Sequence, residues 1–107
     1  MVPVKSIRRY CEAIAREFQP QRIVLFGSHA GGKPHEDSDV DVLVIMKSRP
    51  ALGTRPALAI RQRIAAGFPV DLIVREPEEI KKRILLGDSF LREITEQGRV
   101  MYETADA

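Results

Sequence analysis

A short apolar run that ends at a glycine, followed by a pair of aspartates, constrains this chain more than any other feature. Residues 23–26 include β-branched side chains and stop at Gly27 and Ser28, which is typical of a buried strand that ends at a tight turn. Residues 29–38 have the composition of turns and loops, and a second strand is predicted over residues 39–46.

The second predicted strand begins with two carboxylates, Asp39 and Asp41. Because residues i and i+2 of a strand point to the same face, these side chains are predicted to project side by side, next to the glycine turn. Two carboxylates this close repel each other unless a cation lies between them. Mg²⁺ binds carboxylate oxygens and fills its remaining positions with water and substrate phosphates, so the pattern predicts a magnesium and phosphate site.

A third aspartate completes the predicted site. Asp71 is the only charged residue in the apolar stretch 69–74, which is predicted to form a third strand. If this strand lies beside the second, Asp71 points toward the same space as Asp39 and Asp41. Three carboxylates there would hold paired Mg²⁺ ions, about 3.5–4 Å apart, around a triphosphate. Asp71 is the candidate to hold the catalytic metal and to take the proton from the acceptor hydroxyl.

The turn residues suit phosphate binding, although each also has a plainer explanation. A side chain at Gly27 would block the approach of the backbone to phosphates, and Ser28 offers a hydroxyl and a backbone N–H to a phosphate oxygen. Aspartate is common at strand starts and turns, and His29 and His35 are expected to be exposed loop residues without a metal role. The combination of the turn with three aspartates is what favours a functional site.

Helices and further strand-like segments surround these motifs. The stretch 42–46 is apolar on both faces, so the second strand is predicted to be central in a sheet. The tail at residues 100–103 is apolar and could pack on the sheet or on a partner. Helical periodicity, proline starts and glycine ends predict four helices, over residues 4–18, 57–66, 76–87 and 88–98.

Composition limits the classes of protein that this chain can represent. A length of 107 residues suits a single domain that spans residues 1–107, and a net charge of +2 gives no reason to expect direct nucleic-acid binding. No apolar run approaches the length of a membrane span, and the N-terminus lacks a signal-peptide pattern. The lone cysteine, Cys11, is predicted to be a core residue of a helix, and we expect a cytoplasmic protein.

These residues carry a family resemblance. The Phe-Gly-Ser motif at 26–28, the ten-residue gap, the Asp-Val-Asp motif at 39–41 and the later Asp71 resemble the signature of the DNA polymerase β-like nucleotidyltransferase superfamily. The length and the ending at residues 87–103 resemble the minimal nucleotidyltransferases, which are commonly the antitoxins of HEPN/MNT toxin–antitoxin pairs. The resemblance implies an α+β fold, in which a small mixed β-sheet has helices packed largely on one side.

The resemblance also implies roles for individual residues. The catalytic and metal-binding residues would be Asp39, Asp41 and Asp71, and the nucleotide-binding residues would be Gly27, Ser28 and His29. Relatives usually read Gly-Ser-Arg-Ala-Arg-Gly after the first strand, whereas residues 27–32 read Gly-Ser-His-Ala-Gly-Gly. His29 can still donate to a phosphate, with less bidentate reach than arginine. This departure affects the expected ATP affinity more than catalytic competence, because all three aspartates remain.

By analogy with the family, we expect transfer of AMP from ATP, with Mg²⁺, to a tyrosine of a HEPN ribonuclease toxin, which silences the toxin. Larger relatives carry an extra domain that holds the acceptor, so the acceptor of a 107-residue chain is expected to bring its own binding surface. Two alternatives stay open. One is a binding-only antitoxin with a vestigial site, and the other is a small-molecule nucleotidyltransferase, of the antibiotic-modifying type, that works as a homodimer.

Overall fold

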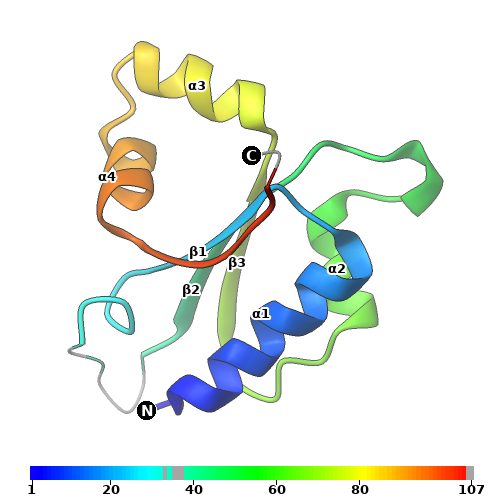
Figure 1. The fold of residues 1–107 in the computed structure, drawn as a ribbon, viewed down its shortest axis with the longest axis vertical. Coiled ribbons are helices and arrows are strands. Elements are labelled where there is room, and N and C mark those ends of the chain that lie inside the picture. The colour runs from blue at the N-terminus through cyan, green and yellow to red at the C-terminus, as the bar shows by residue number, and fades with distance from the viewer. Residues whose placement is uncertain (33, 35–37, 106–107) are drawn as a thin grey trace.

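The computed structural model describes residues 1–32, 34 and 38–105 of the chain (Figure 1). His35 lies outside the described residues, so the expectation that it is an exposed loop residue without a metal role stays a prediction. The elements follow one another along the chain as α1 (Val4–Phe18), β1 (Arg22–Phe26), β2 (Val40–Ile45), a 3₁₀ helix (Pro50–Leu52), α2 (Pro56–Arg63), β3 (Val70–Arg75), α3 (Pro77–Leu85), α4 (Ser89–Gln97) and β4 (Arg99–Glu103).

The four strands form one mixed sheet in the order β3-β2-β1-β4. Strand β1 pairs antiparallel with both β2 and β4, whereas β2 and β3 run parallel. The prediction that the second strand is central is therefore confirmed. The apolar tail is strand β4, which pairs with β1 at the edge of the sheet, so it packs within the chain itself.

The sheet has an apolar core on each face. Because side chains alternate along a strand, Val40, Val42 and Val44 of β2 pack toward α1 and α2. Leu43 and Ile45 of the same strand pack toward α3 and α4 on the opposite face. Figure 1 shows these two helix pairs on either side of the sheet.

The α+β class and the mixed sheet are confirmed, but the expectation that the helices lie largely on one side of the sheet is wrong. The physical reason lies in β2, whose buried residues include both faces of the strand. A strand that is apolar on both faces needs a covering layer on each of them. The second layer is supplied by α3 and α4, through Ile80, Leu91 and Ile94.

Two local predictions at helix ends have different outcomes. Asp88 caps α4 as expected, because its Oδ1 accepts a hydrogen bond from the Leu91 backbone N–H at 3.0 Å. Helix α2 stops at Arg63, short of the predicted end, so Gly67 is not its C-terminal cap. The residue after the helix, Ile64, is extended and buried in the core, which turns the chain toward β3.

Helix α1 has the predicted bounds, and its buried stripe includes Cys11. Burial raises the pKa of the Cys11 thiol to about 12, so this residue is an inert core side chain, as predicted. Within the part of the chain that the structure describes, no helix is long and apolar enough to cross a membrane.

The connection from α4 to β4 requires a glycine, because there is no space for a side chain. A Cβ built on Gly98 would overlap Val24 Cγ1, and it would lie 2.5 Å from the Ile94 carbonyl oxygen and 3.1 Å from the Leu25 carbonyl oxygen. Gly98 has an ordinary negative φ of −69°, so the constraint is steric and not conformational. It lets α4 pack closely on β1.

We expect Gly98→Ala to lower the free energy of unfolding by about 1–3 kcal/mol, because the added methyl must displace backbone atoms and a core side chain. Chemical denaturation followed by circular dichroism measures this change. The control is Gly31→Ala, where a Cβ would meet only ordinary contacts at 3.7 and 3.9 Å. Equal stability of the two variants would contradict the close packing of α4 on the sheet.

Candidate active site

The predicted site forms where β1 ends at Gly27, against the start of β2. Gly27 has a φ of +75°, in the left-handed region that favours glycine. A Cβ built on it would overlap the Asp41 Oδ2 atom and lie 3.1 Å from Asp41 Cγ. Phe26 and Asp41 are partners in the antiparallel register of β1 and β2. Gly27 is therefore needed for two reasons, its backbone conformation and the space that the Asp41 carboxylate occupies.

The parallel pairing of β2 with β3 brings the second and third predicted aspartates together. Asp41 and Asp71 are register partners, and both lie on the sheet face that α3 and α4 cover, because their even-numbered neighbours Val42 and Leu72 face the other core. Asp39 directly precedes β2, and it is exposed like Asp71, whereas Asp41 is half-buried.

The pKa of Asp41 shows which neighbouring charges act on it. Burial raises the pKa of Asp41, and the neighbouring carboxylates of Asp71 and Asp39 raise it further, while His29 lowers it. Asp41 is thus the centre of a group that contains all three predicted aspartates and the predicted histidine. Ionising Asp41 therefore costs more here than in a free side chain, and an approaching positive charge would offset that cost.

The donor chemistry of this group fits a divalent metal ion. Carboxylate oxygens are the ligands that Mg²⁺ prefers, and the repulsion among the three aspartates is the kind that a cation relieves. Among the residues that the structure describes, no three acidic, histidine or cysteine side chains are already arranged as metal ligands. The residues that would hold a metal are Asp41 with Asp71 or Asp39.

The turn that follows β1 orients the other predicted nucleotide-binding residues. The backbone N–H groups of Ala30 and Gly31 donate to the Gly27 carbonyl oxygen at 3.2 and 3.1 Å, which makes a tight turn. Ser28 lies within it, and its hydroxyl has no hydrogen-bond partner among the described residues, so it is available to a ligand oxygen.

His29 is half-buried and not an exposed loop residue. Its Nε2 accepts a hydrogen bond from the Val2 backbone N–H at 3.5 Å, which assigns the proton of the neutral ring to Nδ1. That Nδ1 atom is buried and has no partner within the described parts of the chain. Because this atom is shielded from solvent, a phosphate reaches it only if the ring turns outward.

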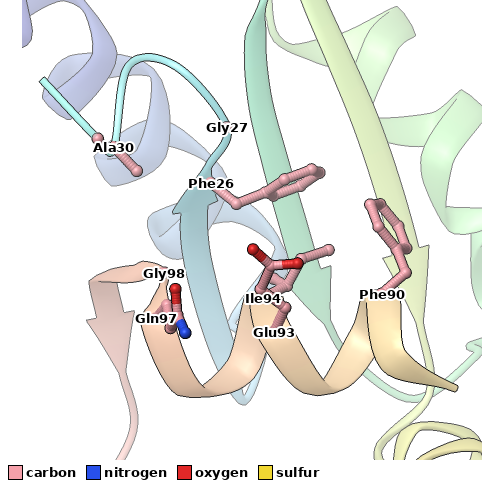
Figure 2. Close-up of a pocket in the computed structure, with 9 residues that line it drawn as sticks. Phe26, Gly27, Ala30, Phe90, Glu93, Ile94, Gln97 and Gly98 are labelled. Atoms are coloured by element: carbon pink, nitrogen blue, oxygen red, sulfur yellow. The ribbon is translucent and has the colours of Figure 1, made fainter. Parts of the chain in front are cut away.

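A cavity of about 430 Å³ adjoins the glycine turn, and no sequence pattern above predicted it. It lies between residues 26–31 and α4, and Figure 2 shows the side chains that line it. Gly27 is a wall of this cavity and also packs against Asp41, so the cavity opens beside the aspartates. The sequence pattern that could have indicated the cavity is the spacing of Phe90, Glu93 and Gln97. This spacing puts three non-core side chains on one face of a helix.

A glycine turn and clustered carboxylates at the ends of adjacent strands define an enzyme that handles phosphate groups. The model of the nucleotidyltransferase domain family matches residues 7–101, and the chain belongs to this family of enzymes. Two proteins of Methanocaldococcus jannaschii, both named as candidate protein adenylyltransferases, are similar to it. One is 30% identical over 100 residues, which cover 92% of this chain and 96% of the relative, and the other is 31% identical over 97 residues, which cover 89% and 91%.

A solved structure supports the same assignment. The crystal structure of a candidate nucleotidyltransferase from Sulfolobus solfataricus aligns with a TM-score of 0.51 at 28% identity, and the alignment covers 74% of this chain and 70% of that chain. The resemblance to a minimal nucleotidyltransferase and the α+β fold are thereby confirmed. Nucleotidyltransferases use a nucleotide substrate and typically a divalent metal.

We expect the metal-free Asp41→Asn variant to be more stable than the wild type at neutral pH. Because the pKa of Asp41 is raised in the folded chain, the folded state holds this proton more tightly than the unfolded state. Ionisation of Asp41 therefore lowers the free energy of unfolding. The loss begins as the pH rises past the ordinary aspartate pKa, about 3.9, and is complete above the pKa of Asp41 in the folded chain. Thermal melts in chelator across pH 3 to 8 measure the difference, which should vanish at the acid end.

The control for that series is Glu12→Gln, on the exposed side of α1, which should follow the wild-type pH profile. A stabilisation by Asp41→Asn that is the same at all pH values would show that it does not arise from ionisation.

We expect Gly27→Ala to abolish binding of Mg²⁺ and ATP, because the new Cβ displaces the Asp41 carboxylate. Gly32→Ala is a matched control, since Gly32 has the same φ of +75° but a Cβ there meets nothing within 4 Å. Both variants should lose about 1 kcal/mol of stability through the left-handed backbone. Gly27→Ala should lose more through its overlap with Asp41, and only Gly27→Ala should lose the ligand. The rise in melting temperature with Mg²⁺ and ATP reports binding.

Ser28→Ala should have a milder effect in the same assay, because it removes one or two hydrogen bonds worth roughly 0.5–3 kcal/mol together. If Gly27→Ala and Gly32→Ala bound ATP equally well, the contact of Gly27 with Asp41 would have no part in nucleotide binding.

Proposed function

We propose that this nucleotidyltransferase transfers AMP from ATP, in the presence of Mg²⁺, to a tyrosine of a partner HEPN ribonuclease toxin and so acts as its antitoxin. The observation that carries the proposal is the position of Asp41, held against Gly27 and in parallel register with Asp71. It puts an acidic group, which would hold a metal ion, beside a turn whose Ser28 hydroxyl is free for phosphate.

Each of the described site residues would have its own role in the reaction. Ser28 would bind a phosphate oxygen, because its hydroxyl lacks a partner within the described chain. His29 would join it only once its buried ring turns outward. Mg²⁺ held by the aspartates would neutralise the charge of the triphosphate. Asp71, at the exposed start of the edge strand β3, is accessible to an acceptor and would take the proton of its hydroxyl.

The chemistry is an in-line displacement at the α-phosphorus of ATP. The tyrosine oxygen forms a bond to this phosphorus, the bond from the α-phosphorus to the oxygen that bridges it to the β-phosphate breaks, and pyrophosphate leaves. The tyrosine proton passes to Asp71. Positioning provides most of the acceleration in such reactions, so free tyrosine should be a very poor acceptor.

The protein acceptor is supported by the two Methanocaldococcus jannaschii relatives, whose names describe protein adenylyltransferases. The HEPN toxin and its tyrosine follow from the resemblance to minimal nucleotidyltransferases of toxin–antitoxin pairs. The loop without arginines, residues 27–32, favours a second candidate, a binding-only antitoxin whose site is vestigial.

The test incubates the protein with ATP, Mg²⁺ and a HEPN protein encoded beside it, and measures intact masses. We expect additions of AMP mass on the HEPN protein, on a tyrosine, together with loss of its ribonuclease activity. Asp41→Asn and Asp71→Asn should lower the transfer rate at least about a hundredfold, since each removes a group that acts in the reaction.

Glu12→Gln, remote from the site, should leave the transfer rate unchanged. If the wild type and both aspartate variants inhibit the toxin fully without any mass change, the binding-only antitoxin is the correct function. Transfer of AMP to an aminoglycoside or another small molecule, and not to the HEPN protein, would favour the small-molecule alternative.

A further inference from the structure

The cavity beside the glycine turn is large enough for a nucleobase and lies where one would be placed. Its volume of about 430 Å³ falls within the range of small-ligand pockets, about 300–1,000 Å³. Gly27 forms part of the cavity wall, and the same residue lies against the Asp41 carboxylate. A nucleotide whose phosphates lie at Gly27 and the aspartates can therefore extend its base into this cavity.

The cavity has an aromatic wall. The rings of Phe26 and Phe90 meet edge to face with their centroids 5.8 Å apart, and both line the space. Phe90 remains 53% exposed, although it is a large apolar side chain. A ring that is fixed on one side and open on the other is a suitable surface for stacking of a base.

Two polar side chains of α4 complete the lining. Figure 2 shows the Glu93 carboxylate directed from α4 toward Phe26 and the turn, and the Gln97 amide beside Gly98. Neither side chain has a hydrogen-bond or ion-pair partner in the described residues. Their neighbour Glu96, outside the cavity, is instead paired with Arg92 at 3.3 Å. Of the two glutamates of α4, the unpaired one is thus the one that lines the cavity.

We infer that this cavity binds the base of the donor nucleotide and that Glu93 selects a purine that carries an exocyclic amino group. A carboxylate only accepts hydrogen bonds, so it requires a donor on the base, and the amino groups of adenine and guanine are such donors. Gln97, which can donate and accept, is suited to a neighbouring ring nitrogen or to the amino group itself. The inference rests on the proposed nucleotide-dependent function.

The test compares nucleotides that differ by the amino group alone. Titration calorimetry with Mg²⁺ would measure ATP against purine riboside triphosphate, and GTP against ITP. In the wild type, removal of the amino group from the preferred purine should weaken binding about tenfold, which corresponds to about 1.4 kcal/mol. Glu93→Ala should abolish this difference, whereas Glu96→Ala, on the same helix but outside the cavity, should preserve it.

Inorganic triphosphate separates base recognition from phosphate recognition. Its affinity in the presence of Mg²⁺ should be the same in the wild type, Glu93→Ala and Phe90→Leu, while Phe90→Leu should weaken ATP severalfold through lost stacking. Thermal melts of each variant check that the fold is intact.

The inference is overturned if neither nucleotide pair shows a difference in the wild type, or if Glu93→Ala keeps the difference. It is also overturned if Glu93→Ala and Phe90→Leu weaken triphosphate as much as ATP. Amino-group selection with no transfer to the HEPN protein would contradict the proposed acceptor and support the base site, so the two failures are distinguishable.

Discussion

The contact between Gly27 and the Asp41 carboxylate is the constraint on which the site depends. It exists because β1 and β2 pair antiparallel with Phe26 opposite Asp41, so that the end of one strand meets the start of the other. The next residue after Phe26 must turn away with a positive φ and leave room for the carboxylate. One glycine thus sets the turn that presents Ser28 and the position of the central acid.

The two-sided sheet has a direct consequence for function. Strand β2 is buried on both faces, and α3 and α4 cover the face that carries Asp41 and Asp71. The same packing that buries Leu91 and Ile94 leaves Phe90 and Glu93 along the edge of the covered area. Core packing and the cavity are therefore made by adjacent faces of one short helix, and Ile94 contributes to both.

The cluster of aspartates lowers the free energy of unfolding of the chain when no cation is bound. Burial and two neighbouring carboxylates raise the pKa of Asp41, so its ionisation costs more in the folded state than in the unfolded chain. Such strain at a site is common in enzymes, because the arrangement that binds a cation and a triphosphate well is poor without them. The apolar cores on both faces of the sheet provide the stability that tolerates it.

The sequence by itself determined most of the helices and strands, and it pointed to the acidic residues of a candidate site. Periodicity and turn residues located α1 and the buried strands, and the spacing of Gly27, Asp39 and Asp41 identified the acidic site, because these signals act between residues close in the chain. Asp71 was foreseen only on the condition that β3 lies beside β2, a condition that the parallel register meets.

Only the tertiary structure decided what depends on contacts between distant segments. It placed helices on both faces of the sheet, paired the tail with β1 as β4, and turned His29 toward Val2. It also made the cavity, because Phe26 and Glu93 are 67 positions apart and become neighbours only when α4 packs on β1. Local sequence patterns carry no record of such pairings, since packing of whole layers selects them.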